Sequence, residues 1–185
     1  MPTSASPEFS WPIPEPMLVD ADLTLLPWRD VSSIAGVRED LLESSRDPRM
    51  VRWTQVPSPY TEDHLESFLE PPTDALRWAI VLDGRYCGNV GLRLDSEQHR
   101  AAEFGYSTSP WARGRGVMRR AVQLVTDHAF AHGIHRLVIK AGVDNAASRH
   151  VAEQAGYTFE GVSRGGELLH GEFHDLAQYS RLATD

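Results

Sequence analysis

In the first part of the chain, the spacing of the apolar residues predicts a short strand, two helices and then three further strands. The run 23–26 predicts a strand, and apolar positions at helical spacing over 30–45 predict a helix that begins after Asp30. A shorter helix is expected after Thr61, whose hydroxyl can cap it. Beyond this helix the spacing becomes that of strands. The ranges expected as three antiparallel strands are 78–82, 86–94 and 101–108.

The second part of the chain alternates helix and strand. Eight apolar residues between Val117 and Phe130 recur at helical spacing, and the continuous apolar run 137–139 is typical of a strand buried on both faces. A helix capped by Asp144 is expected next. The last two strands are predicted over 157–162 and 173–182, so the whole pattern predicts an α/β (α+β) fold, a mixed sheet with helices on both faces.

The N-terminal residues have a different composition. Residues 1–16 contain five prolines, so neither helix nor strand can propagate there. We expect an extended, solvated arm, although Phe9 and Trp11 could instead pack on the body or on a neighbour. Because no repeat and no second linker follows, residues 17–185 are expected to form a single domain.

Charge and cysteine content narrow the class of protein. The chain of 185 residues has 18 Lys and Arg against 26 Asp and Glu, a net charge of −8, which disfavours nucleic-acid or anionic-membrane binding and favours a cationic substrate. The single Cys87 excludes a disulfide framework and a cysteine zinc module, and it suits a small core residue. No apolar run approaches a membrane span and no signal-peptide pattern is present, so we expect a cytoplasmic protein.

The chemistry concentrates in the turn over residues 109–120, which joins a predicted strand to the strongest predicted helix. Gly114 and Gly116 free its backbone for close approach, and four arginines follow one another within eight residues. Arg119 and Arg120 fall in the first helical turn, where cations oppose the helix dipole unless an anion binds. The turn therefore points to a polyphosphate ligand, and the alternative is a glycine turn with solvated arginines. NAD and ATP are disfavoured because their glycine motifs are incomplete here.

Two motifs in this order resemble a known family. Arg113-x-x-Gly116 at the start of a helix resembles the acyl-coenzyme A pyrophosphate loop of the GNAT superfamily of N-acetyltransferases. The segment 144–148, Asp-Asn-Ala-Ala-Ser, with Gly156 eleven residues after Asn145, is similar to that family's Asn-x-x-Ser helix. The pattern over 25–61 is similar to the branch of ribosomal-protein N-terminal acetyltransferases and related small-amine transferases, so the resemblance covers about residues 20–182.

The resemblance implies a mostly antiparallel sheet whose fourth and fifth strands splay apart to admit the pantetheine arm of acetyl-coenzyme A (acetyl-CoA). It implies no metal. Met118 departs from the small residue usual at its position and is expected to join the core. The positions implied to contact the coenzyme are the backbones of Tyr106, Ser107 and Thr108, the loop residues Arg113, Gly114, Arg115, Gly116, Val117, Met118 and Arg119, and Asn145 on the far wall.

Acyl transfer to an amine needs a neutral amine, a polarised thioester carbonyl and a proton for the leaving thiolate. Glu103, in the middle of a predicted strand, is a candidate general base, and a structural carboxylate bonded to a neighbouring strand is the equal alternative. The tyrosine that many family members use as acid is replaced by Ala152. Ser148 resembles the serine that assists the leaving sulfur in the ribosomal-protein branch, unless its hydroxyl bonds the preceding helical turn.

These residues predict an acyl-CoA-dependent N-acyltransferase, in the first place an N-acetyltransferase that acts on a primary amine of a small molecule or protein N-terminus by direct attack in a ternary complex. One alternative is transfer of a larger acyl group such as succinyl, for which Arg149 is a conceivable partner. Another is a non-catalytic CoA-binding regulatory module, which Ala152 keeps open. A homodimer is expected from the branch.

The acceptor side is less defined. The residues that could approach an acceptor are Trp53, Tyr60 and His64, for which aromatic core packing is equally expected, and Arg164 with 170–175, where Asp175 would suit a cationic amine.

Overall fold

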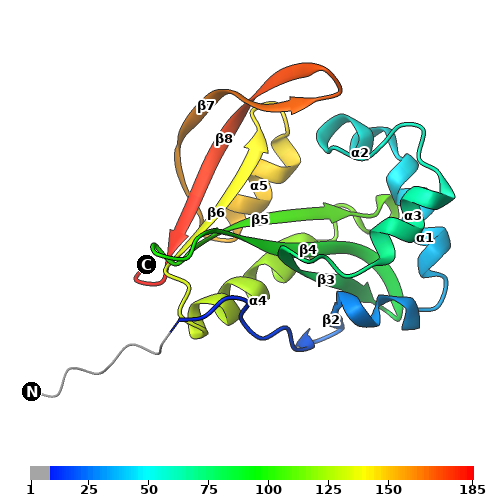
Figure 1. Cartoon of the computed structure of the whole chain (residues 1–185), viewed down its shortest axis with the longest axis horizontal. Coiled ribbons are helices and arrows are strands. Elements are labelled where there is room, and N and C mark those ends of the chain that lie inside the picture. Colours follow the sequence, from blue (N-terminus) through cyan, green and yellow to red (C-terminus); the bar gives the residue numbers. More distant parts are fainter. Residues whose placement is uncertain (1–8) are drawn as a thin grey trace, which may run out of the picture.

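An eight-stranded sheet forms the centre of the computed structural model, which describes residues 9–185 (Figure 1). The strand order is β1-β2-β3-β4-β5-β6-β8-β7, and every neighbouring pair is antiparallel except β5 and β6. This mixed, mostly antiparallel sheet confirms the predicted fold class. The strands are β1 Leu18–Asp20, β2 Leu23–Pro27, β3 Ala75–Leu82, β4 Arg85–Ser96, β5 Ala101–Thr108, β6 Arg136–Gly142, β7 Thr158–Leu169 and β8 Glu172–Leu182.

Helices cover both faces of the sheet because alternate strand residues face opposite sides. In β3, Trp78 and Ile80 join the apolar core beneath α4 and α5, while Ala79 joins a second core beneath the first helices of the chain. The two cores confirm the prediction of helices on both faces. The helices are η1 Trp28–Ser33, a 3-10 helix, then α1 Val37–Arg46, α2 Pro48–Trp53, α3 Glu62–Leu69, the short η2 Pro110–Ala112, α4 Val117–Ala131 and α5 Ala146–Gln154.

The single helix predicted over 30–45 is wrong. The chain forms η1 and then α1, because Gly36 adopts a left-handed φ of +70° that interrupts helical geometry between them. The short α2 was also not predicted, since Pro48 looks like a breaker in the sequence. Asp47 caps this helix by accepting from the amides of Arg49 and Met50, and Pro48 occupies its first turn. The cap expected at Thr61 is confirmed, with His64 completing a capping box.

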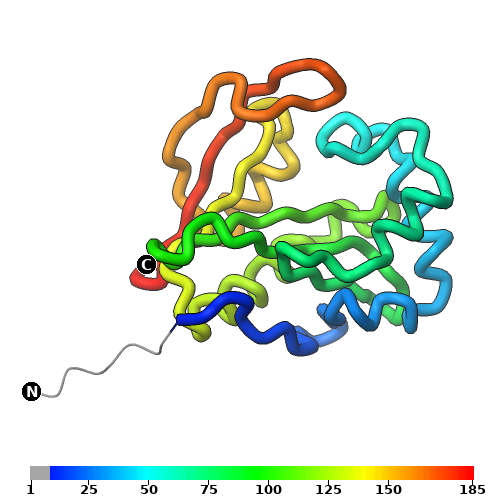
Figure 2. Tube along the Cα trace, in the orientation of Figure 1, coloured from blue at the N-terminus to red at the C-terminus, as the bar shows by residue number. Residues whose placement is uncertain are grey.

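The arm predicted to be solvated packs on the body over residues 9–16, so that prediction is wrong for this part, while residues 1–8 lie outside the described residues. Ile13 is only 3% exposed, and the Pro16 carbonyl accepts a hydrogen bond of 2.8 Å from Trp78 Nε1. Figure 2 shows this segment running beside α4, where His128 Nε2 lies 2.7 Å from the Pro14 carbonyl oxygen. Prolines prevent regular structure in the arm, but they leave its carbonyls free to accept from the body.

The parallel pair β5 and β6 is incomplete, and this positions the candidate site. The two strands pair only over Ala101–Phe104 and Arg136–Ile139. Beyond these residues they diverge, as Figure 1 shows, so that Gly105–Thr108 and Lys140–Gly142 are not paired with each other. In chain order these are the fourth and fifth strands predicted from the sequence, and the expected splay is confirmed.

Candidate functional site

The turn before α4 presents a row of backbone amides. Gly114 and Gly116 adopt left-handed φ angles of +74° and +71°, and Gly116 is the N-cap of α4 without any side-chain cap. Within the described chain, no amide from Gly114 to Arg119 donates to a carbonyl of a turn, loop or cap or to a side chain. A Cβ added at either glycine would meet nothing within 4 Å, so the space in front of the turn is open. Unpaired amides at a helix N-terminus are suited to bind an anion.

The arginines of this turn are more strongly neutralised than the sequence suggested. Arg120 donates from Nε to Asp20 Oδ2 at 2.7 Å and pairs with Asp22, which removes its conflict with the helix dipole without any ligand. Arg113 pairs with Asp47 at 2.5 Å, and this hydrogen bond holds the pKa of the Asp47 carboxyl below its usual value. Among residues 9–185, only Arg119 of the four lacks an ion pair, so it is the cation most available to a bound anion.

A pair of hydroxyls bridges the splay. Tyr106, on the unpaired end of β5, has its Oη 2.9 Å from Ser148 Oγ and donates to the Ser148 carbonyl at 3.2 Å. Burial raises the pKa of Tyr106 to about 12, so its hydroxyl stays protonated at neutral pH. The hydroxyl of Ser148 therefore bonds β5 across the gap rather than the preceding turn of its own helix. This side-chain contact was not predicted from the sequence, where only the backbone of Tyr106 was expected to take part in the site.

The N-terminus of α5 is capped one residue later than predicted. The side chain of Asn145, not that of Asp144, accepts from the Ser148 amide at 3.2 Å, and α5 begins at Ala146. The N-cap is the last non-helical residue, here Asn145, and an Asn side chain is as good an acceptor at this position as an Asp side chain. On the opposite wall of the gap, Ser107 Oγ of β5 accepts a hydrogen bond of 2.9 Å from Asn89 on the adjacent strand β4. The walls of the splay thus carry Asn145 and Ser148 on one side and Tyr106 and Ser107 on the other.

Glu103 lies where β5 and β6 are still paired, on the face opposite to Tyr106. Its Oε2 accepts a hydrogen bond of 2.7 Å from Lys140 Nζ, and Arg93 lies 4.0 Å from its other oxygen. The side chain is 20% exposed. This pairing has the features of the structural alternative, because the carboxylate is bonded to the neighbouring strand β6 through Lys140. The role of Glu103 as base stays a prediction.

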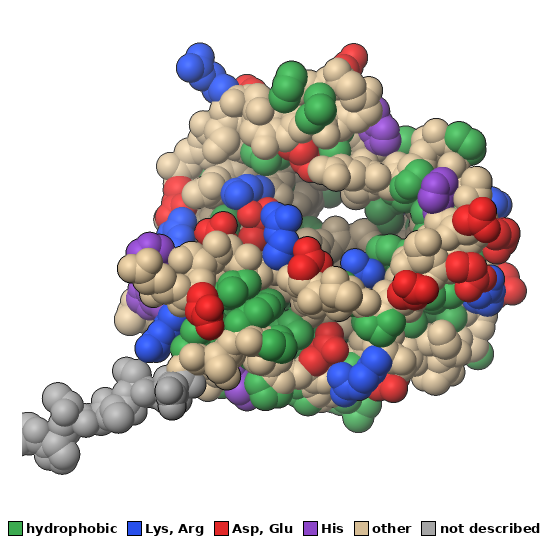
Figure 3. Space-filling model, in the orientation of Figure 1, with side chains coloured by type: hydrophobic (Ala, Val, Ile, Leu, Met, Phe, Trp, Pro, Cys, Tyr) green, Lys and Arg blue, Asp and Glu red, His purple; other side chains and the backbone are tan. Residues whose placement is uncertain are grey.

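A cleft of about 400 Å³ opens beside the end of β6. In Figure 3 the surface is hollowed between the β7–β8 hairpin and the helices that face it. His170 at the turn of this hairpin donates from Nε2 to the carbonyls of Val51 (2.8 Å) and Thr54 (3.1 Å), at the C-terminal end of α2. The cleft is lined by Trp53, Gly142, Val143, Asp144, Phe173, His174 and Asp175.

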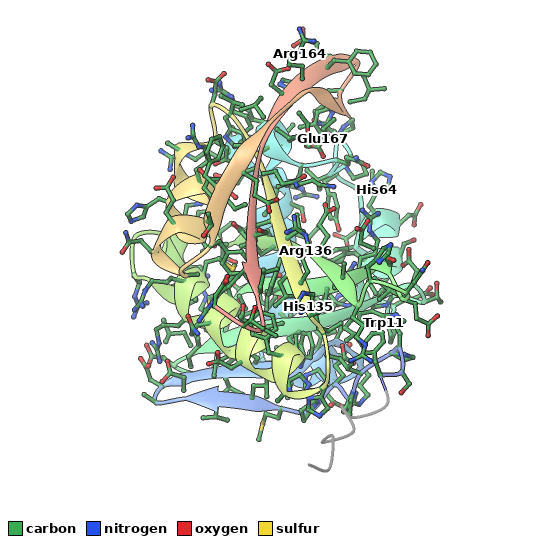
Figure 4. The ribbon with its side chains drawn as sticks, turned by 90° about the vertical axis from the view of Figure 1, so that its left-hand side faces the viewer. Trp11, His64, His135, Arg136, Arg164 and Glu167 are labelled. Carbon is green, nitrogen blue, oxygen red and sulfur yellow. The ribbon has the colours of Figure 1, made fainter. Side chains whose placement is uncertain are left out.

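Of the residues predicted to approach the acceptor, some line the cleft and others support the fold. Trp53 lines the cleft, and its ring stands so close to Gly142 that an added Cβ would lie 3.0 Å from it. Tyr60 is buried in the core beneath α1 and α3, and His64 serves the capping box of α3. Figure 4 shows Arg164 at the outer end of the β7–β8 hairpin, and it does not line the cleft.

Other predicted positions behave as core or scaffold. Met118 is 5% exposed within the main core, as expected, and Cys87 is fully buried. Arg149 donates to Tyr179 Oη at 2.9 Å and to the Val143 carbonyl at 3.1 Å. Over residues 9–185, no three side chains of His, Cys, Asp or Glu gather as a metal site. In the same residues, no helix is long and apolar enough to cross a membrane.

The comparisons with known proteins agree with the splay and the turn. Residues 23–158 match the acetyltransferase (GNAT) domain family. The chain belongs to this family. YdaF of Bacillus subtilis (strain 168) is 35% identical over 107 residues, which cover 57% of this chain and 58% of YdaF. The ribosomal-protein-serine acetyltransferase of Escherichia coli (strain K12) is 33% identical over 109 residues, which cover 58% of this chain and 61% of that protein. The matches thus span less than two thirds of these relatives.

Solved structures extend the similarity beyond the matched residues. RimL, a ribosomal L7/L12 α-N-protein acetyltransferase solved in complex with coenzyme A, has a TM-score of 0.78 at 26% identity and covers 90% of this chain and 98% of its own. The acetyltransferase of Salmonella typhimurium that modifies the N-terminal serine of ribosomal protein L7/L12 has a TM-score of 0.75 at 25% identity, covering 90% and 99%. The resemblance drawn from the sequence motifs is confirmed at the level of family and fold.

Proposed function

We propose that the protein is an acetyl-CoA-dependent N-acetyltransferase that acts on a primary amine of a small molecule or a protein N-terminus. The observation that carries this proposal is the joint presence of an open splay between β5 and β6 and a row of unpaired amides at the start of α4. A slot between strands suits the pantetheine arm, and amides at a helix N-terminus suit a pyrophosphate. The family of the chain and the coenzyme bound to RimL support the same ligand.

In this proposal each wall of the coenzyme half of the site has a role. The amides of Gly114 to Arg119 hold the pyrophosphate, and Arg119 adds a positive charge. The backbones of Tyr106, Ser107 and Thr108 face pantetheine on one wall of the splay. Asn145 lies on the opposite wall, where its side chain fixes the first turn of α5.

The reaction half of the site takes one proton from the attacking amine and stabilises the leaving thiolate of coenzyme A by a hydrogen bond. Acetyl-CoA supplies the acetyl group as an activated thioester. Glu103 accepts, directly or through water, the proton lost by the attacking amine as the N–C bond forms, and Ser148 donates a hydrogen bond toward the sulfur as the C–S bond breaks. The amine enters from the cleft beside β6, whose Asp144 and Asp175 favour a cationic acceptor.

Acetyl is the preferred acyl group. A succinyl group would need a free cation near the acyl end, and the guanidinium of Arg149 is already engaged with Tyr179 and Val143. The non-catalytic module remains an outcome of the binding test below. The hydroxyls of Tyr106 and Ser148, which meet at the splay, support catalysis over this module.

The experiment is calorimetric titration with acetyl-CoA, succinyl-CoA and free CoA, followed by thiol release over a panel of amines. The matched variants are Gly116→Val and Gly36→Val, because both glycines are helix N-caps at nearly the same φ, +71° and +70°, with nothing within 4 Å. Both substitutions strain the backbone equally. We expect only Gly116→Val to weaken acetyl-CoA binding, by about tenfold or more, since it blocks the approach to the amides.

Three results are informative. Binding with turnover on any amine establishes the acyltransferase. Binding without turnover supports the regulatory module instead. Absence of binding, or equal affinities of the Gly116→Val and Gly36→Val proteins, contradicts the placement of the pyrophosphate.

A further inference from the structure

Among residues 9–185, the hydroxyl of Ser148 has one hydrogen-bond partner, and that partner lies on the other wall of the splay. The Tyr106 ring extends from the unpaired end of β5, and its Oη approaches both oxygens of Ser148, Oγ at 2.9 Å and the carbonyl at 3.2 Å. One turn further along α5, Ala152 is buried and carries no hydroxyl. The tyrosine hydroxyl next to Ser148 therefore comes from a strand, not from the helix.

The two hydroxyl protons of Tyr106 and Ser148 can be arranged in two ways. A carbonyl oxygen only accepts, so when Tyr106 donates to it, Ser148 Oγ is left to donate back to Tyr106. When Tyr106 instead donates to Oγ, the proton of Ser148 is released and can point elsewhere. Rotation of two hydroxyls interconverts the states without moving any heavy atom. Tyr106 thus determines whether Ser148 is available as a donor.

We propose that Tyr106 is a positioning residue that holds Ser148 Oγ at the wall of the splay and donates to it while Ser148 donates to the departing sulfur. This inference rests on the proposed N-acetyltransferase activity. In this arrangement Tyr106 donates to Ser148 and Ser148 donates to the sulfur, and no proton leaves Tyr106. A donor that is itself hydrogen-bonded at its oxygen is a stronger donor, because the bonds polarise one another.

Two contacts hold the arrangement in place. Asn145 Oδ1 accepts from the Ser148 amide at 3.2 Å, which fixes the backbone of Ser148. The Tyr106 ring packs against the main core. Because burial keeps Tyr106 protonated far above neutral pH, its hydroxyl is a donor throughout any assay range.

The test is Tyr106→Phe, which removes one oxygen atom and keeps the ring. Its matched control is Tyr157→Phe, since Tyr157 Oη also pairs with a hydroxyl, Thr126 Oγ1 of α4, at 2.7 Å and does not contact Ser148. Thiol release from acetyl-CoA is measured with a peptide amide that begins with serine and with spermidine. Tyr106→Phe is expected to lower kcat roughly three- to tenfold, as expected for one hydrogen bond, with KM for acetyl-CoA changed less than about twofold. Tyr157→Phe is expected to leave kcat unchanged.

A double mutant separates positioning from direct contact. If Tyr106 acts through Ser148, the Tyr106→Phe/Ser148→Ala protein has the same kcat as Ser148→Ala alone. Multiplied losses in the double mutant, a Tyr106→Phe effect no larger than that of Tyr157→Phe, or a change confined to KM would each overturn the inference. A wild-type protein that binds acetyl-CoA but releases no thiol with any amine overturns the proposed function itself, and the positioning role with it.

Discussion

Glu103 lies beside two cations, Lys140 and Arg93, at the point where the splay begins. Its carboxylate is held by Lys140 at 2.7 Å, next to the residues where β5 and β6 separate. The same contact can orient a base toward an amine or simply bind two strands together. The two roles differ in their dependence on pH, because a base is needed most where the amine is protonated.

We predict that Glu103→Gln lowers kcat mainly at low pH and leaves the affinity for acetyl-CoA nearly unchanged, since the carboxylate lies away from the turn before α4. The measurement is kcat as a function of pH, with affinity taken from calorimetry. Glu160→Gln is the control, because Glu160 also pairs with a cation of β6, Arg136, but outside the splay. A Glu103→Gln profile with the shape of the wild-type profile would assign Glu103 a structural role only.

Single residues were predictable where the reason for them is local. The turn glycines, the core position of Met118 and the cap at Thr61 follow from neighbours within a few positions. The partners of the arginines do not, because Arg113 meets Asp47 across 66 residues of sequence. Pairing of this kind depends on the folded sheet, and the same is true of Tyr106 and Ser148.

At the scale of elements, a β-bulge in β7 places the carboxylate of Glu160 where it links β7 to β6 and β8. The register of β7 against β8 shifts between Phe159 and Gly161, which sets Glu160 outside the regular pairing. From there it accepts from Arg136 on β6 at 2.8 Å and from Gln178 and Ser180 on β8, at 3.0 Å and 2.7 Å. These hydrogen bonds, that of Arg136 first, lower the pKa of Glu160 from 4.5 to about 2.

A lowered pKa in the folded state stabilises the fold above the ordinary pKa of the group, and the effect is lost as pH falls through the folded value. We predict that Glu160→Gln lowers the free energy of unfolding by about 1 kcal/mol at pH 7, the upper range for a partly exposed pair. The difference from wild type should decrease from about pH 5 and be nearly absent at about pH 2. Urea unfolding over this range measures it, with Glu97→Gln, an exposed glutamate without an ion pair in residues 9–185, as control. A constant difference across pH would contradict this account.

Elements with an apolar stripe were predictable, and the short α2 was not. α4 and β5 follow closely the ranges expected from spacing, because each buries one continuous stripe of side chains. α2 has six residues and no buried position, so its sequence has no apolar stripe to detect. β7 continues past its predicted end at Val162 to Leu169, because the exposed residues 163–166 give no apolar alternation to detect, whereas β8 begins within one residue of its predicted start.

At the scale of the whole molecule, a contact between the β7–β8 hairpin and α2 joins the two sides of the cleft. His170 on the β7–β8 hairpin donates to α2, more than 110 residues earlier in the chain. Trp53, from the same helix, stands against Gly142 inside the cleft. The hairpin and α2 therefore form one continuous wall on the side from which the proposed acceptor enters, while the coenzyme turn lies at the start of α4.

This separation predicts that loss of the contact affects one substrate and not the other. His170→Ala removes the donor shared by Val51 and Thr54, so the hairpin is held less firmly against α2, and we expect KM for the amine to rise roughly three- to tenfold. The dissociation constant of acetyl-CoA is expected to stay unchanged, because none of its proposed contacts involves the hairpin. Steady-state kinetics with each substrate varied in turn measure both effects, and His99→Ala, an exposed histidine in the turn before β5, is the control. A parallel rise in the dissociation constant of acetyl-CoA would mean that the hairpin supports the splay itself rather than the acceptor side alone.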